Sequence, residues 1–156
     1  MVGLIKIMLR SKNQVVEMVK DSLKEKVFAL KQDISSLVID SSENSKPTSG
    51  DKHEVGFEMA MGELDRLSAQ LDTYKRQLSE LELMDFTEKV RVESGALVKT
   101  NRGLFFVSVA FGLLKVDGLS IFCLSSQSPL AQAMMGKRNG DAVELNGITH
   151  KVIEVK

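Results

Sequence analysis

Apolar residues recur at alternating steps of three and four over residues 57–81, and this spacing is the strongest constraint that the sequence places on the fold. The spacing is typical of a helix that presents one apolar seam to another helix, as in a coiled coil. Such a helix needs a partner, because an apolar stripe left in water is unfavourable. The seam positions are Phe57, Ala60, Leu64, Leu67, Leu71, Tyr74, Leu78 and Leu81.

A second stripe precedes this one and supplies the partner helix. Most residues between its apolar positions are polar or charged, as on an amphipathic helix. Residues 40–50 separate the two stripes, and they include the helix breakers Pro47 and Gly50. The sequence therefore predicts an antiparallel helical hairpin over residues 1–86, with a tip loop at about residues 40–52. The first stripe comprises Val16, Val19, Leu23, Val27, Leu30, Ile34 and Leu37.

The same heptad pattern has a second interpretation, which is association between chains. Paired heptad helices commonly join subunits or form halves of a four-helix bundle. A homo-oligomer held together by the coiled coil therefore stays open beside a single protruding hairpin. Sedimentation distinguishes the two, because a compact dimer would hide both seams.

Residues 87–156 have a different character, with short β-rich runs separated by glycines. Ser128 is suited to cap a short helix that ends near Met135, and Pro129 suits its first position. The fold class is thus α+β, with an N-terminal antiparallel coiled-coil hairpin followed by a small antiparallel β-sheet domain with one short helix. The expected strands are residues 96–100, 104–111, 119–124, 142–145 and 148–155.

Composition narrows the classes of function. Lys and Arg together number 21, and so do Asp and Glu, so no strong field favours direct sequence-specific DNA binding. Cys123 is the only cysteine, which excludes a disulfide framework and fits a reducing cytoplasm. No run approaches the ~18 apolar residues that a membrane span requires. The apolar start, Met1 to Arg10, is interrupted by Lys6 and is not interpreted as a signal peptide.

The run from Ser125 to Asp141 carries a family resemblance. Its Ser-Pro-Leu helix start, its Gly136-Lys137 and its Gly140-Asp141 resemble the closing segment of the Gre transcript-cleavage factors of bacterial RNA polymerase. The resemblance implies that residues 87–156 form an FKBP-like domain, and that RNA polymerase is the partner. It makes Ser128, Pro129, Lys137 and Arg138 the candidate partner-binding residues. The alternative for Lys137 and Arg138 is simple placement at a helix C-terminus, where cations are favoured.

The hairpin tip carries a second point of resemblance. Gly50-Asp-Lys-His-Glu54 looks like the Gly-Asp-x-x-Glu of Gre factors. In that family the acidic pair reaches through the polymerase secondary channel and helps to hold a second Mg²⁺ at the active site. The resemblance implies that Asp51 and Glu54 are the catalytic and metal-binding pair, with Mg²⁺ shared with the polymerase and no cofactor in isolation. Mg²⁺ prefers oxygen ligands, and a second metal activates water and stabilises the leaving oxygen.

Other interpretations of the tip stay open. Asp40 and Glu43 form a second acidic pair, which ends the first helix instead of opening the second. Acids in a first helical turn also stabilise the helix without any catalytic role. Lys46, Lys52 and His53 place positive charge beside the acids, which weakens a carboxylate as a metal ligand.

The resemblance therefore implies a cytoplasmic, transcription elongation-factor-like protein that is not an enzyme by itself. It would bind polymerase near the secondary channel and stimulate cleavage of backtracked transcripts. One alternative is a Gre-like regulator that binds without promoting cleavage. Another is a protein that shares only the fold, as an interaction protein or a prolyl isomerase. Isomerase pockets are rich in aromatic residues, and this chain has no Trp and one Tyr. Cys123, in an apolar strand, is interpreted as structural.

Overall fold

The computed structural model describes the backbone of residues 12–43 and 50–156, together with their side chains except those of residues 41–43 and 50–54. Two compact units make up this part of the chain. One contains the described residues up to Lys20 together with Ser79–Lys156, and the other is Asp21–Leu78. The expectations for the chain start and for the loop around Pro47 lie outside the described residues. The domain boundary expected after residue 86 stays a prediction.

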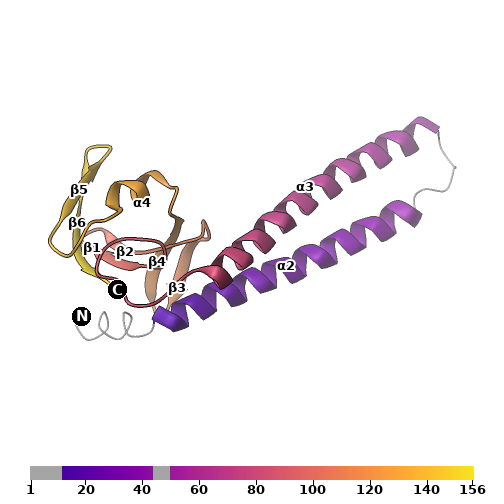
Figure 1. The fold of residues 1–156 in the computed structure, drawn as a ribbon. Helices are drawn as coiled ribbons and strands as arrows, with labels where there is room; N and C mark the ends of the chain where they lie inside the picture. The colour runs from indigo at the N-terminus through magenta and orange to yellow at the C-terminus, as the bar shows by residue number, and fades with distance from the viewer. Residues whose placement is uncertain (1–11, 44–49) are drawn as a thin grey trace. The chain divides into compact units, whose positions relative to one another are not determined.

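Two long helices account for the first half of the chain (Figure 1). Helix α2 is Lys12–Glu43, with 32 residues, and helix α3 is Gly50–Leu83, with 34 residues. Both helices continue into the range expected as tip loop. In the unit 21–78 they run antiparallel, and the Lys26 amine lies 5.6 Å from the centre of the Tyr74 ring.

The predicted apolar stripes are the parts of these helices that avoid solvent. On α2, Leu23 and Leu30 are buried and the later stripe residues are half-buried. On α3, Leu67 is buried and most of the other stripe residues are half-buried, but Phe57 is 51% exposed. The stripe therefore covers the middle of the hairpin and fails at the beginning of α3.

A six-stranded sheet fills most of the other unit, in the order β3-β4-β2-β1-β6-β5. The sheet is mixed, which corrects the expected antiparallel arrangement, because β2 and β4 pair in parallel. The other neighbours are antiparallel. The strands are β1 (Leu97–Thr100), β2 (Gly103–Ser108), β3 (Gly112–Val116), β4 (Leu119–Ser125), β5 (Ala142–Leu145) and β6 (Ile148–Val155).

Strand β3 is absent from the sequence-based expectation. It forms a tight hairpin with β4 through Asp117 and Gly118, whose φ angles of 49° and 81° suit a two-residue turn. Its residues alternate between exposed Leu113 and buried Leu114, as expected for a strand with one covered face. A turn at Asn146 and Gly147 likewise joins β5 to β6, with φ angles of 53° and 78°.

Helix α4, Pro129–Met134, lies over one face of the sheet and supplies Ala131 and Met134 to its core. The start of α2 belongs to the same unit as the sheet, and its Lys12 side chain ties it there. The Lys12 amine donates hydrogen bonds of 3.1 Å to the carbonyls of both Thr87 and Lys156. Among the described residues, no helix is long and apolar enough to cross a membrane. The core residues around α4 are Val92, Ala96, Val98, Val107, Leu124, Ala131, Met134, Val143 and Val152.

Candidate functional site

The two candidate acidic pairs lie at the adjoining ends of α2 and α3. Asp40 is exposed in the last turn of α2, and Glu43 is its final residue. Asp51 and Glu54 lie in the first two turns of α3. The side chains of Glu43, Asp51 and Glu54 lie outside the described part of the chain, so their geometry stays a prediction. Residues three apart on a helix share a face, so the two acids of each pair start from the same side of their helix.

The two acidic pairs lie at helix ends of opposite partial charge. The N-terminus of a helix carries partial positive charge, which stabilises Asp51 and Glu54 where they are. The C-terminus of α2 carries partial negative charge, which is unfavourable for Asp40 and Glu43. Helix stability therefore accounts for the first pair and gives no reason for the second. A pair of carboxylates suits Mg²⁺ only if other ligands complete its coordination. Among the described side chains, no group of three or more His, Cys, Asp or Glu is placed to hold a metal.

The candidate residues around α4 have clear structural roles. The Ser128 hydroxyl accepts a hydrogen bond of 3.2 Å from the backbone N–H of Ala131, which makes Ser128 the N-cap. Pro129 is the first helical residue, where no N–H is needed. Both residues therefore shape the segment that resembles Gre factors.

Lys137 and Arg138 follow Gly136 and do not lie in the last turn of α4, which ends at Met134. The backbone N–H of Lys137 donates a hydrogen bond of 3.0 Å to the carbonyl of Met134, the last residue of the helix, so placement just after the helix C-terminus stays an interpretation beside partner binding. Two backbone hydrogen bonds of 2.8 Å hold this segment to Val92, one from Gly136 N–H to the Val92 carbonyl and one from Val92 N–H to the Lys137 carbonyl. Arg138 is exposed, and Lys137 is half-buried.

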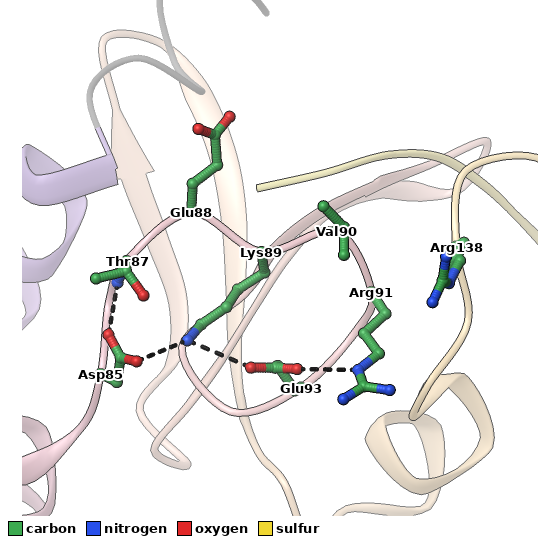
Figure 2. A pocket seen from close by; sticks show the side chains of 8 residues that line it. All are labelled: Asp85, Thr87, Glu88, Lys89, Val90, Arg91, Glu93 and Arg138. Carbon is green, nitrogen blue, oxygen red and sulfur yellow. Dashed lines mark hydrogen bonds and ion pairs between the residues drawn. The ribbon is translucent and has the colours of Figure 1, made fainter.

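Arg138 lines a pocket of about 490 Å³ together with the segment that joins α3 to the sheet (Figure 2). At its centre, the buried Lys89 amine lies 3.2 Å from an Asp85 carboxylate oxygen and 3.3 Å from one of Glu93. Arg91 forms an ion pair with Glu93 at 3.3 Å. The other lining residues are Thr87, Glu88 and Val90.

Hydrogen bonds set the charge state of this pocket. The backbone N–H of Thr87 donates to Asp85 at 2.9 Å, and this bond, with help from the Thr87 hydroxyl and Lys89, lowers the pKa of Asp85 to about 2. Lys89 is the first cause that lowers the pKa of Glu93. Both carboxylates are thus ionised at neutral pH around a buried cation. The pocket is thus lined mainly by charged side chains, and ion pairs join four of them: Asp85, Lys89, Arg91 and Glu93.

Sequence reasoning missed this cluster. Its signal was present as an acid, a lysine and an acid at positions 85, 89 and 93, a spacing of four. That spacing normally indicates an exposed helix face. Here the segment is not helical, so the chain closes around Lys89 instead. Cys123, by contrast, is buried as expected of a structural residue, and burial raises the pKa of its thiol to about 12.

The described architecture is that of an α+β protein in which a helical hairpin precedes a mixed six-stranded sheet with one short helix. No family model matches the sequence, and no curated protein matches it. The chain is similar to solved structures of a GreA factor homolog named Gfh1.

One similar structure is that of the transcription factor Gfh1, with 18% identity over 87% of this chain and 92% of that one, and a TM-score of 0.37. Another is Gfh1 from Thermus thermophilus, with 20% identity over 90% and 94% of the two chains and a TM-score of 0.33. A third is Gfh1 from Thermus aquaticus, with 21% identity over 89% of this chain and 92% of that one, and a TM-score of 0.30.

Proposed function

We propose that this protein is a Gre-type accessory factor that binds bacterial RNA polymerase near its secondary channel and promotes cleavage of backtracked transcripts. In this proposal α2 and α3 form a coiled coil, and residues 87–156 form an FKBP-like domain that docks on the polymerase. The protein acts in the cytoplasm. It supplies carboxylates and reach, and the polymerase supplies the remainder of the active site.

The observation that carries the proposal is the position of the acids. Asp40 and Glu43 end one long helix, and Asp51 and Glu54 begin the next. At ~1.5 Å per residue, each helix is on the order of 50 Å long, which is enough to carry a charged tip deep into a channel. Asp51 and Glu54 rank first as Mg²⁺ ligands, because the Gly-Asp-x-x-Glu resemblance covers them. Asp40 and Glu43 rank second.

In this proposal, positive charge beside the pocket helps residues 87–156 to dock on the polymerase. Arg138 is exposed at its rim, and no ion pair of its side chain is found among the described residues. A guanidinium of this kind suits a carboxylate of a partner, because it presents a fork of hydrogen-bond donors. Lys137, next to it, adds a second positive charge.

The test uses stalled, backtracked elongation complexes from the bacterium that makes this protein, with Mg²⁺ present. We expect the protein to shorten the RNA from its 3′ end. The double variant Asp51→Asn with Glu54→Gln should abolish shortening and leave binding intact. Asp21→Asn with Glu25→Gln is the matched control, because it removes two exposed acids of the same hairpin far from the tip in sequence. Equal activity of both double variants would contradict the proposed tip.

A second candidate function is a regulator that occupies the channel without promoting cleavage. Lys52 favours it, because an ammonium between Asp51 and Glu54 in the sequence competes with Mg²⁺ for their charge. The same experiment separates the two functions. Binding to polymerase without shortening would support the regulator, and Lys52→Gln would then be expected to gain cleavage activity.

A further inference from the structure

The beginning of α3 is apolar on more than its seam. Over residues 55–62 the only charged residue is Glu58, and the others are Val, Phe, Ala, Met and Gly. Over residues 63–80, by contrast, every position outside the seam other than Ala69 is polar or charged. A helix that is apolar all round is normally buried. This part of α3 is instead solvent-exposed, so its composition calls for a partner.

Six exposed apolar side chains lie at the beginning of α3 and in the last turns of α2, and we call them the apolar collar. Four come from α3, and two come from the last turns of α2, next to Asp40. Their exposed fractions run from 39% at Met61 to 72% at Met59. The collar comprises Val38, Ile39, Val55, Phe57, Met59 and Met61.

The collar residues of α3 point in two nearly opposite directions. Val55 and Met59 are four residues apart, so they share one face of the helix. Phe57 and Met61 share another face, about 160° away, because each residue advances by about 100°. Phe57 lies on the seam face, but α2 does not cover it here, because its side chain is 51% exposed. A flat surface on the face of Val55 and Met59 would therefore leave the face of Phe57 and Met61 in water. A partner that covers both pairs must enclose the end of the hairpin.

Charge narrows the kind of partner further. Residues 31–66 contain eight acidic and four basic residues, a formal charge of −4, in a chain with a net charge of zero. Two copies of this end would repel each other, so a second copy of the chain is disfavoured as the occupant. An enclosing surface with apolar walls and a basic rim would complement both features.

We infer that the apolar collar is a binding surface that a channel of the partner protein grips on two sides, behind the acidic tip. This inference rests on the proposed function, in which that channel is the secondary channel of RNA polymerase. The collar then fixes how far the hairpin enters. It supplies affinity through burial of Met59 and Met61, while the acids serve the metal.

The test measures binding of the full chain to immobilised core RNA polymerase, with Met59→Gln and Met61→Gln as separate variants. Glutamine resembles methionine in size and helix propensity, so each variant changes polarity and leaves the helix intact. We expect each to weaken binding by about tenfold, as for loss of most of one buried apolar side chain. Phe28→Gln, at a 65% exposed apolar position outside the collar, is the control and should bind as the unaltered chain does.

The outcomes separate the two proposals. Weaker binding by both methionine variants, with the Phe28 variant unchanged, supports a channel that encloses the collar. Unchanged binding by both variants, or an effect of only one, overturns the inference and leaves the proposed function standing. Absence of binding by the unaltered chain overturns both. Concentration-dependent dimerisation that Met59→Gln abolishes would identify a second copy as the occupant and would also overturn the inference.

Discussion

At the residue scale, the segment between α3 and the sheet depends on two residues, Lys89 and Gly95. Lys89 neutralises Asp85 and Glu93 from a buried position, so loss of its charge would leave two carboxylates facing each other. Gly95 lets the backbone of this segment close around Lys89. A Cβ at this position would lie 2.1 Å from the carbonyl oxygen of Asp85, and φ is +91°. The close approach and the positive φ both require glycine.

We predict that Gly95→Ala destabilises the protein by about 2–4 kcal/mol, because it combines a backbone clash with left-handed strain. Gly118→Ala is the matched control, since its φ is +81° and nothing lies within 4 Å of the added Cβ. That control should cost about 1 kcal/mol through strain alone. Urea unfolding measures both. Equal losses for the two variants would show that the close approach to Asp85 has no energetic consequence.

Lys12 gives a pH-dependent prediction at the same scale. Burial is the first cause, and the positive charge of Lys89 the second, that lower the pKa of Lys12 from 10.5 to about 8. Asp85, Glu88 and Glu93 act in the opposite direction. Between these pH values the unfolded chain binds more protons than the folded one, so stability rises with pH.

The prediction is a rise of at most about 1.4 kcal/mol per pH unit between pH 8 and 10.5 from this group. The quantity to measure is the difference in stability between the unaltered chain and Lys12→Met, because pH effects that both chains share cancel in it. The unaltered chain should gain stability relative to this variant as pH increases from 8. A difference that is constant with pH would contradict the lowered pKa.

At the scale of elements, α4 depends on its first two residues. Ser128 accepts the Ala131 N–H, and Pro129 fixes the first turn of a helix of only 6 residues. We predict that Ser128→Ala costs about 1 kcal/mol and that Ser128→Asp recovers most of it, because aspartate also caps helices. Thermal unfolding measures both. A weakening of polymerase binding in Ser128→Asp at full stability would point to direct contact by the serine.

An element could be predicted from the sequence when the pattern that specifies it spans only a few neighbouring residues. The helices of the hairpin and the capped helix α4 follow from spacing and from Ser128-Pro129, which act over a few residues. Strand β3 was missed because Gly112 and Gly118 bound a run of five residues, and glycines at such spacing also indicate a loop. The parallel pairing of β2 with β4 joins strands that are not consecutive, and no short-range pattern specifies it.

At the scale of the whole molecule, the chain separates two kinds of surface along its sequence. Residues 31–66 carry a formal charge of −4 and the apolar collar, and the remaining residues carry +4. The candidate acids were found from sequence because Gly-Asp-x-x-Glu is a short pattern. The collar was not, because Phe57 also fits the seam and only its exposure reveals that the seam fails there.

We propose that Asp51 and Glu54 hold Mg²⁺ in the polymerase active site. The most direct measurement is the Mg²⁺ concentration for half-maximal shortening of backtracked transcripts, with and without the protein. We expect the protein to lower this concentration, and we expect Asp51→Asn with Glu54→Gln to restore the value of polymerase alone. The same Mg²⁺ dependence in the presence and absence of the protein, at saturating binding, would contradict the claim.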